Sequence, residues 1–333
     1  MKENLLYERK ADYQFYKIKG THKEIGFETA KKGGKLIGAT KLSNEQKRYA
    51  LECRNIVREV YPEIILEFEG YANALSLQEE DLLWHYSLGA KGGCSSFAVM
   101  TDKGILSGRN YDYYYFENRR HLIHTEPTVG YSSIGMHEGL VGGRFDGMNE
   151  KGLFVSFNGA GGTPIKSKPG ISVQLIVRLL LEKCKTAKEA KSVLLEIPIK
   201  EPNSYMIVDN EDAFVIEAHP ERKEVINMEN GYLLATNHFT HLNMRKYNKV
   251  NNHTFERYSK IASDLEELIS KNPDMDNQYE SIKNILVEHD PPICGHEDGF
   301  ATFWSSISNL KDKKIYYCLG APCRNKYAEY LKF

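Results

Sequence analysis

The sequence predicts an α+β protein in which helices and strands are stacked in layers. Along the 333 residues the predicted strands come in blocks separated by pairs of helices. Such blocks favour packed layers over a doubly wound parallel sheet. Hydrophobic residues make up 41% of the chain and charged residues 27%, which is the balance of a globular protein with a buried core. Length alone is compatible with one large domain or two ordinary ones.

The first 93 residues are expected to be mostly helical. A long amphipathic stretch runs from about Asn44 to Ala74 and is divided by Pro62, because proline cannot continue a helix from its interior. Two helix starts are predicted from capping boxes, in which a hydroxyl and a carboxylate each satisfy an unpaired backbone N–H group. The two pairs are Thr21 with Glu24 and Ser76 with Glu79.

The pattern changes at Gly92-Gly93-Cys94. Short, partly alternating runs broken by glycines then indicate strands and turns, and they read SSFAVMTD, GILSGRNYDYY, YSSIGMHE and GLFVSFNG. A helical pattern returns at SVQLIVRLLLEKC, and Thr186 with Glu189 opens a second helix after it.

The last third of the chain is predicted to contain a strand meander, a helix pair and a final strand pair. The meander reads SYMIVDN, DAFVIEAH, KEVINME and GYLLATNH. The two helices are expected near Phe255–Ser270 and Asn277–His289. The final strands read ATFWSSISNL and KKIYYCLG.

Composition excludes several classes of function. The formal net charge is -1 and no basic stripe with interleaved aromatic residues occurs, so nucleic acid is not an expected partner. No apolar run approaches the roughly 18 residues that a membrane span needs, and the N-terminal stretch lacks the apolar centre of a secretory signal. Six cysteines are spread widely through the chain. This spacing suits free thiols in a reducing compartment, so a cytoplasmic protein is expected.

Cys94 is the first candidate for chemistry. Two glycines precede it, and they permit a sharp backbone bend just before a thiol that enters a strand. A small buried apolar residue after a turn would produce the same pattern. On these residues alone, both interpretations stay open.

Arg109 and Asp112 lie on the next predicted strand. A hairpin turn at Thr101–Gly104 would fold that strand back beside the Cys94 strand and bring both side chains to the same end. An arginine there can favour the thiolate form of a cysteine or hold a substrate carbonyl. An Arg–Asp pair on a solvated strand is the alternative.

Several motifs, in this order along the chain, resemble those of a known family. They read GGCSSF, GRNYD, DGMNEKGLFVSFN, ATNH, FERYSKI, ICGH and TFWSSISNLKDKKIYYCLGAPC. The sequence resembles the acyl-coenzyme A:6-aminopenicillanate acyltransferase family of cysteine N-terminal-nucleophile hydrolases, also called isopenicillin N acyltransferase-like. More distantly it is similar to the choloylglycine (bile salt) hydrolases. The leader, with GTHKEIGFETAKKGG, resembles the family's pro-segment.

The resemblance implies an αββα sandwich, with two stacked antiparallel sheets between helical layers. It also implies an inactive precursor that cuts its own Gly93–Cys94 bond. Residues 1–93 would be the helical leader and residues 94–333 the catalytic region, together forming one globular unit. The two pieces are expected to stay together after cleavage, because the leader's amphipathic helices would otherwise expose apolar faces.

The resemblance also implies roles for individual residues. Cys94 is the implied nucleophile, and Arg109 and Asp112 match the family's site arginine and aspartate. Asn158 and Asn237 match its oxyanion-binding and positioning asparagines, and Arg257 matches the arginine that supports the nucleophile. The implied activity is attack on a linear, non-peptide N-acyl amide through a thioester. Release to water or transfer to an amine is left open.

A run of aromatic side chains lies beside Asp112 in the sequence. Tyr111, Tyr113, Tyr114 and Phe116 are equally compatible with a substrate pocket and with the core. Ser95 and Ser96 could donate hydrogen bonds during self-cleavage, but ordinary strand positions are favoured. The expected partner is a small-molecule amide or acyl donor. The oligomeric state, a homo-oligomer included, is open.

Three other interpretations compete with this one. His238 lies 144 residues after Cys94, inside the papain-like window of about 130–150 residues, but GGCSSF lacks the papain signature. A metal site from His289, Cys294, His296 and Asp298 fits no tight zinc spacing, so neither a metal nor another cofactor is expected. An unprocessed, inactive homologue with a binding role remains the alternative from a different class.

Overall fold

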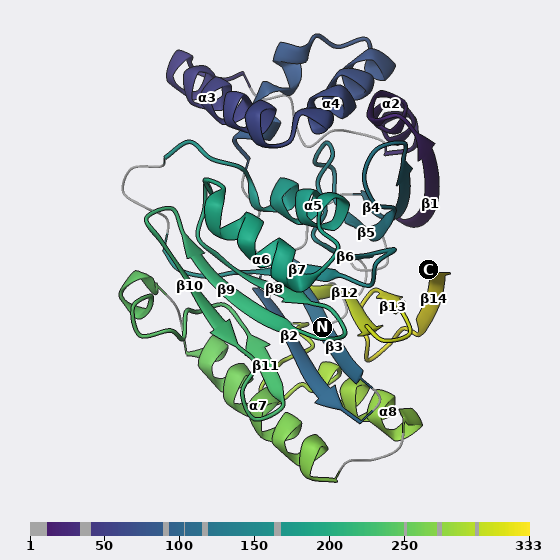
Figure 1. Cartoon of the computed structure of the whole chain (residues 1–333), viewed down its shortest axis with the longest axis vertical. Coiled ribbons are helices and arrows are strands. Elements are labelled where there is room, and N and C mark those ends of the chain that lie inside the picture. The colour runs from purple at the N-terminus through teal and green to yellow at the C-terminus, as the bar shows by residue number, and fades with distance from the viewer. Residues whose placement is uncertain are drawn as a thin grey trace.

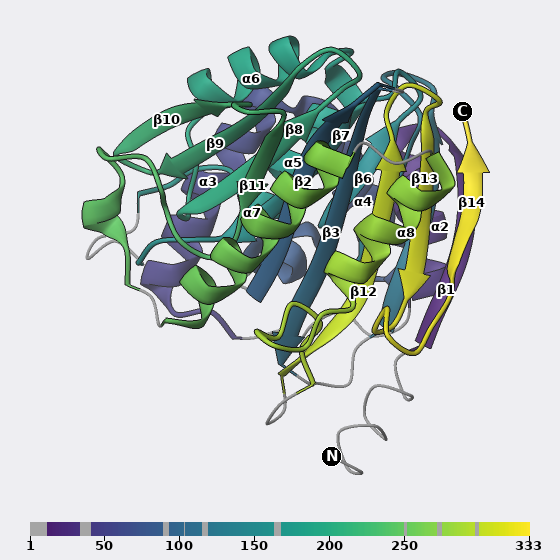
Figure 2. The same ribbon diagram turned by 90° about the horizontal axis from the view of Figure 1, so that it is seen from below.

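The computed structural model confirms the predicted αββα sandwich. It describes residues 12–33, 41–88, 93–102, 104–114, 119–162, 168–249, 252–271, 275–296 and 300–333. Two sheets face each other, and a helix pair covers the outer face of each (Figures 1 and 2). The pair on the larger sheet is α5 (Val173–Lys183) with α6 (Ala187–Glu196). The pair on the smaller sheet is α7 (His253–Lys271) with α8 (Met275–Leu286).

The larger sheet has eight strands in the order β1-β4-β5-β6-β7-β8-β9-β10. Every neighbouring pair is antiparallel except β1 and β4, which run parallel. The strands are β1 (Asp12–Gly20), β4 (Arg119–Pro127), β5 (Ser133–His137), β6 (Asp146–Asn149), β7 (Phe154–Gly159), β8 (Asn203–Val208), β9 (Ala213–His219) and β10 (Arg222–Asn227).

The smaller sheet has six strands in the order β11-β2-β3-β12-β13-β14. The predicted hairpin is confirmed, because β2 and β3 pair antiparallel from the turn at Thr101 and Gly104 onward. The strands are β2 (Gly93–Thr101), β3 (Gly104–Tyr114), β11 (Tyr232–Ala235), β12 (Phe300–Asn309), β13 (Lys314–Leu319) and β14 (Tyr327–Lys332).

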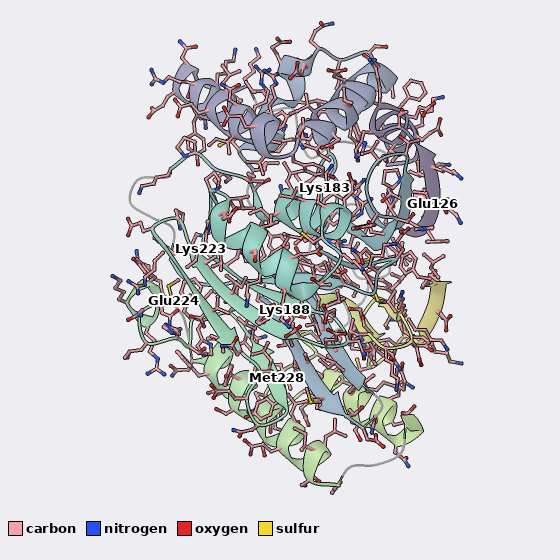
Figure 3. All side chains as sticks on the ribbon, viewed as in Figure 1. Glu126, Lys183, Lys188, Lys223, Glu224 and Met228 are labelled. Carbon is pink, nitrogen blue, oxygen red and sulfur yellow. The ribbon has the colours of Figure 1, made fainter. Side chains whose placement is uncertain are left out.

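The predicted meander is only partly right. Strands β8, β9 and β10 form it, but β11 leaves for the other sheet and pairs with β2. Lys223 of β10, labelled in Figure 3, donates to the carbonyls of Leu194, Leu195 and Ile197 at the end of α6. This interaction satisfies carbonyls that a helix end leaves unpaired and ties α6 to the sheet.

Described helices between His22 and Tyr86 add a further layer outside α5 (Figure 1). It contains α2 (His22–Gly33), α3 (Asn44–Val60), α4 (Pro62–Leu75) and the 3₁₀ helix η1 (Glu79–Tyr86). Pro62 separates α3 from α4 as predicted. Thr21 and Glu24 form the predicted capping box, with the Thr21 backbone nitrogen 2.8 Å from the Glu24 carboxylate.

Two predictions for this layer need correction. The capping box at Ser76 and Glu79 is wrong: Ser76 ends α4 in a left-handed conformation, and Gln78 with Asp81 caps η1 instead. The helix start there is shifted by two residues, because αL termination of α4 consumes Ser76. Strand β1 was not predicted at all, since its ladder partner among the described residues, β4, lies about a hundred residues later in the chain.

Buried ionic contacts hold this layer to α5. His22 of α2 lies 2.6 Å from Glu182, and Arg178 lies 3.3 Å from Glu67 of α4 and 3.0 Å from Glu182. Lys183, labelled in Figure 3, pairs with Glu63 at the surface. Because buried charges are costly unless paired, these contacts fix the layer in one position.

Helices α2 and α4 cross in direct backbone contact. A Cβ atom added at Gly26 would lie 1.9 Å from the Glu67 carbonyl oxygen, and one at Gly70 would lie 1.9 Å from the Lys23 carbonyl oxygen. Only glycine fits such a crossing. Among the described residues, no helix is long and apolar enough to cross a membrane.

Candidate active site

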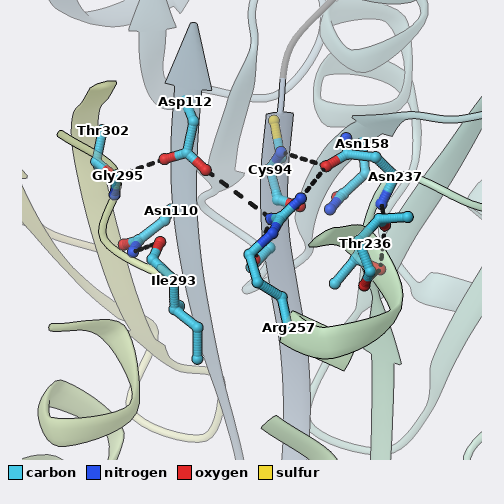
Figure 4. Close-up of polar contacts among 12 residues, drawn as sticks. Cys94, Asn110, Asp112, Asn158, Thr236, Asn237, Arg257, Ile293, Gly295 and Thr302 are labelled. Atoms are coloured by element: carbon cyan, nitrogen blue, oxygen red, sulfur yellow. Dashed lines mark hydrogen bonds and ion pairs between the residues drawn. The ribbon is translucent and has the colours of Figure 1, made fainter. Parts of the chain in front are cut away.

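Cys94 is the second residue of β2, a strand that lies between β11 and β3 (Figure 4). It pairs with Tyr111 of β3, while Ser96 pairs with Ala235 of β11. Asn237 therefore lies two residues beyond the end of the β11 ladder, level with Cys94. The Cys94 side chain is 0% exposed. The pairing thus places the buried thiol near the start of β2, inside the smaller sheet.

The backbone nitrogen of Cys94 is held by a side chain instead of a ladder partner. It donates to Oδ1 of Asn237 at 3.0 Å. The same oxygen accepts from Nη2 of Arg257 at 2.6 Å, and Nδ2 of Asn237 donates to the Gly159 carbonyl at 2.9 Å. These contacts orient the Asn237 amide from both ends (Figure 4).

The sulfur of Cys94 lies beside Arg109, whose Nη2 is 3.8 Å away. Arg109 is 0% exposed. Its Nε donates to Asp146 at 2.9 Å, and its Nη1 donates to the Phe157 carbonyl at 2.7 Å. The guanidinium is therefore locked in place by the facing sheet, with one nitrogen left toward the thiol.

Asp146 is a site residue that the sequence analysis missed. Besides Arg109, its carboxylate accepts hydrogen bonds from Trp304 Nε1 at 2.8 Å and Tyr317 Oη at 3.0 Å. The only signal for it was its place at the start of DGMNEKGLFVSFN. Its partners lie on β3, β12 and β13, so only the folded chain reveals its contact with Arg109.

Arg257 reaches the site from α7. Its Nη1 donates to the Cys94 carbonyl at 3.1 Å and to Ser95 Oγ at 2.8 Å, and lies 3.9 Å from Asp112. Burial lowers the pKa of Arg257, whereas the negative charge of Asp112 opposes that shift. One guanidinium thus contacts Cys94, its neighbour and the candidate aspartate.

Asp112 is buried at the edge of this group. Thr302 Oγ1 donates to it at 2.6 Å, and the Gly295 backbone nitrogen donates to the same hydroxyl oxygen at 2.8 Å. Burial raises the pKa of Asp112 to about 6, and Arg257, the Thr302 hydrogen bond and Arg109 oppose the shift. A fraction of these carboxyl groups is consequently protonated near neutral pH.

Asn158 lies across from β2 on β7. Its Oδ1 accepts from Ser96 Oγ at 2.7 Å and from Arg109 Nη1 at 3.4 Å, and its Nδ2 donates to the Ala235 carbonyl at 3.0 Å. An amide nitrogen carries two hydrogens, and one hydrogen of each candidate asparagine is bound to a backbone carbonyl.

Burial also controls the protonation of the Cys94 thiol. It raises the pKa of Cys94 to about 11, although the positive charges of Arg109 and Arg257 pull in the other direction. With Gly93 still attached, Cys94 is therefore a protonated thiol at neutral pH.

The aromatic run splits between the core and the undescribed residues. Tyr111 lies in the core and stacks on Trp304 with ring centroids 3.9 Å apart. Tyr113 packs against the same core while partly exposed. Tyr114 ends β3, and Phe116 lies outside the described residues. The pocket interpretation thus has no support at Tyr111.

The papain-like alternative finds no geometry in its favour. Nδ1 of His238 contacts the hydroxyls of Thr236 and Thr254 at 3.1 and 3.0 Å. Within the described ranges, no histidine nitrogen makes a hydrogen bond with the Cys94 sulfur. Of the metal set considered from sequence, Asp298 lies outside the described residues. The other three members, His289, Cys294 and His296, lie close together.

Comparisons with known proteins agree with this architecture. The chain resembles a mutant conjugated bile acid hydrolase from Clostridium perfringens, with 18% identity, a TM-score of 0.51, and coverage of 72% of this chain and 97% of that chain. A second variant of that enzyme gives 17% identity, a TM-score of 0.50 and the same coverage. A Caenorhabditis elegans N-acylethanolamine-hydrolyzing acid amidase ortholog gives 19% identity and a TM-score of 0.49, covering 66% of this chain and 93% of that chain. No curated protein sequence matches.

The two bile acid hydrolase structures, with TM-scores of 0.51 and 0.50, show that this chain shares their fold. Residues 99–324 match the family model described as acyl-coenzyme A:6-aminopenicillanic acid acyl-transferase. The match begins just after Cys94 and spans Arg109, Asp112, Asn158, Asn237 and Arg257. It supports an enzyme with amidohydrolase or acyltransferase activity. The chain belongs to the acyl-coenzyme A:6-aminopenicillanic acid acyl-transferase family.

Proposed function

We propose that this protein is a self-processing cysteine amidohydrolase or acyltransferase that attacks a linear N-acyl amide with Cys94. One observation carries the proposal: two separate groups hold the backbone nitrogen and the sulfur of the same residue. Asn237 holds the nitrogen at 3.0 Å, and Arg109 lies 3.8 Å from the sulfur. A nucleophile that uses its own amino group as base needs both atoms fixed.

Self-cleavage would use the same groups. The Cys94 thiol attacks the Gly93 carbonyl carbon, a C–S bond forms, and the C–N bond to Cys94 breaks. The nitrogen takes up the thiol proton and becomes an amine. Water then hydrolyses the internal thioester, leaving a carboxylate on Gly93 and a free thiol on Cys94. Arg257, bound to the Cys94 carbonyl, would hold the residue still while the bond on its other side is cut.

Cleavage would supply the base that the precursor lacks. Burial keeps the Cys94 thiol protonated while Gly93 is attached. A new α-amino group has an ordinary pKa of about 7.7–8.0 and lies within reach of its own sulfur. Asn237, which already accepts from this nitrogen, would orient the amine toward the thiol.

The substrate reaction then has two steps. The amine takes the thiol proton, the sulfur attacks the amide carbonyl, and the same proton passes to the leaving amine. The acyl group remains on sulfur as a thioester. Asn237 and Asn158 are the proposed oxyanion donors, and losing one such donor typically costs about 2.7–4 kcal/mol of barrier. Water would complete a hydrolysis, and a second amine would complete a transfer.

The proposed cut after Gly93 would divide the chain into two parts. Residues 1–93 would form the leader and residues 94–333 the catalytic region, and the leader would stay bound after the cut. The buried contacts of His22 and Glu67 with α5 support its retention. All six cysteines are free, which agrees with a reducing compartment, and we place the enzyme in the cytoplasm.

Intact-mass measurement of the purified protein tests self-processing. Wild type should appear as two polypeptides divided after Gly93, and Cys94→Ala should stay whole. Cys53→Ala, which changes a buried cysteine of α3, is the matched control and should be cut like wild type. Wild-type protein that stays whole after long incubation would overturn self-processing and favour an inactive homologue.

Trapping the acyl-enzyme tests the nucleophile. Cut protein is mixed with a chromogenic N-acyl anilide series of increasing acyl length, quenched in acid and weighed. The fragment beginning at Cys94 should gain the mass of the acyl group. Adding a primary amine before the quench divides hydrolysis from transfer, because only a transferase forms the new amide faster than the acid. No acyl adduct and no anilide turnover across the series would count against the proposal.

A further inference from the structure

A second group of chemically reactive side chains lies beside the active site. Nitrogen or sulfur atoms of His289, Cys294, His296 and Cys323 all lie within 4.8 Å of one another. Nε2 of His296 lies 3.4 Å from the Cys294 sulfur and 3.1 Å from the Cys323 sulfur. The rings of His289 and His296 have centroids 5.3 Å apart.

The backbone brings these side chains together from two distant segments. Three of the residues lie in the loop after α8, and Cys323 lies in the turn between β13 and β14. The turn residues Arg324 and Asn325 both donate to the Ala321 carbonyl at 3.1 Å. The four groups therefore converge through tertiary structure and not through a local motif.

The loop that carries three of them is firmly tied down. The backbone nitrogens of Ile293 and Cys294 both donate to the Glu288 carbonyl, at 3.0 and 2.8 Å. Asn110 of β3 donates to the carbonyls of Leu286 and Ile293, at 2.8 and 2.9 Å (Figure 4). A preformed loop of this kind lowers the ordering cost of binding.

We propose that these four side chains bind one zinc ion in a closed, tetrahedral site. Two sulfurs and two imidazole nitrogens are the donor set of structural zinc sites, and this set disfavours magnesium and calcium, which prefer oxygen. Bonds of about 2.3 Å to sulfur and 2.0–2.1 Å to nitrogen place tetrahedral ligand atoms about 3.3–3.8 Å apart. The two nitrogen–sulfur separations of His296, 3.4 and 3.1 Å, are close to this range. The most widely separated ligand atoms, up to 4.8 Å apart, must approach by about 1 Å.

Charge and protons balance in this step. Both sulfurs bind as thiolates, so any proton that a thiol carries is released to solvent, and the two thiolates neutralise the double charge of the ion. With all four positions filled by protein, no open position remains for water or substrate. The ion would therefore stabilise structure and take no part in the reaction at Cys94.

The site is connected to Asp112 through one residue. Gly295 lies between the ligands Cys294 and His296, and its backbone nitrogen donates to Thr302 Oγ1, which donates to Asp112. A metal that fixes Cys294 and His296 would fix Gly295 as well. Zinc loss should then slow self-cleavage by loosening the support of Asp112, an effect that rests on the proposed function.

The spacing explains why sequence did not predict the site. The set weighed from sequence contained Asp298 as its fourth member, and no tight zinc pattern matched it. The fourth member here is Cys323, which no spacing rule connects to the loop. The sole signal was a cysteine in the turn APC at 321–323.

Metal content of untagged protein tests the proposal directly. Protein made in zinc-supplemented medium, purified under reducing conditions and desalted, is analysed by elemental mass spectrometry. Wild type and uncut Cys94→Ala should both carry stoichiometric zinc, so the result is independent of self-processing. Cys323→Ser and His289→Ala should fall to background, whereas Cys53→Ala and His253→Ala should keep the metal. Zinc absent from wild type, or retained by both ligand variants, would overturn the site.

Cobalt reports the ligands without relying on any variant's folding. Wild-type protein stripped with a chelator and reloaded with Co²⁺ should develop a thiolate-to-cobalt charge-transfer band and the intense visible bands of tetrahedral cobalt. Stripping should also lower Tm, and zinc should restore it. A spectrum without thiolate bands, or a Cys294–Cys323 disulfide in reduced wild type, would contradict the proposal.

Discussion

The side-chain oxygen of Asn237 accepts a hydrogen bond at 3.0 Å from the backbone nitrogen of Cys94, 143 residues earlier in the chain. Strand β11 ends at Ala235, so the Asn237 amide takes over where backbone pairing stops. The contact therefore places a polar side chain on the atom that would become the amine base. It makes Asn237 the first residue to test.

Asn237→Ala should slow self-cleavage by about tenfold or more, the usual cost of leaving a buried N–H group without its acceptor. The change removes the acceptor for Cys94 and the partner of Arg257 Nη2. A time course of precursor loss by mass spectrometry gives the rate. The exposed Asn243→Ala is the control and should process normally, and an unchanged rate in Asn237→Ala would assign the residue to the fold alone.

Variants of Arg109 and Asp146 can distinguish a contribution to stability from a contribution to self-cleavage. Arg109→Met leaves the buried Asp146 carboxylate without its charged partner and should cost roughly 3–5 kcal/mol in the free energy of unfolding. Adding Asp146→Asn should recover much of that loss, because the amide oxygen can accept from Trp304 Nε1 while the amide nitrogen donates to the Tyr317 hydroxyl oxygen.

Both variants should fail to cut themselves if Arg109 acts on the thiol. Urea unfolding measures the stability, and intact mass measures the cutting. A double variant that is stable and cuts at the wild-type rate would show that Arg109 serves packing only.

Asp112 should make stability depend on pH. Its pKa is raised from 3.8 to about 6 by burial, so its contribution is complete below the unfolded value and is lost as pH rises through the folded value. The total is roughly 3 kcal/mol, of which about 1 kcal/mol falls between about pH 5 and about pH 7.5. Asp112→Asn lacks this titration.

The comparison is made in the uncut Cys94→Ala background, by urea unfolding at the two pH values. Relative to its parent, the Asp112→Asn variant should gain about 1 kcal/mol in the free energy of unfolding on going from the lower to the higher pH. Other titrating groups cancel in the difference. A difference that stays constant or moves the other way would contradict the raised pKa.

The crossing of α2 and α4 predicts a sharp contrast between two glycines of one helix. Gly26→Ala should destabilise the protein by at least about 1–3 kcal/mol, because its Cβ would meet the Glu67 backbone and force the helices apart. At Gly33 the nearest atom to an added Cβ is the Tyr71 hydroxyl, 3.7 Å away. Gly33→Ala should therefore be neutral or slightly stabilising. Thermal unfolding distinguishes the two, and equal effects would refute the close crossing.

Local patterns predicted the layers, the β2–β3 hairpin and most helices well. Pro62, Thr21 and Thr186 act on their immediate neighbours, so short stretches of sequence are enough to interpret them. Sequence motifs also led to the five candidate residues that the structure brings around Cys94: Arg109, Asp112, Asn158, Asn237 and Arg257. Their roles remain predictions.

What sequence could not predict depends on distant partners. Strand β1 exists because β4 pairs with it, and β11 joins β2 instead of β10. Asp146 is recognised as a site residue through its hydrogen bond with Arg109, and Cys323 as a candidate ligand through its contact with His296. In each case the partner is a residue far along the chain, and β structure depends more on such neighbours than on propensity.

The parallel pairing of β1 with β4 gives the leader a share of the larger sheet. A cut after Gly93 would then leave two polypeptides that hold one sheet in common. Unfolding would release two separate polypeptides. Refolding would then require the two to meet, so the refolding yield would fall on dilution. The intact precursor refolds in a unimolecular reaction, whereas the mature enzyme would depend on the height of its unfolding barrier for its lifetime.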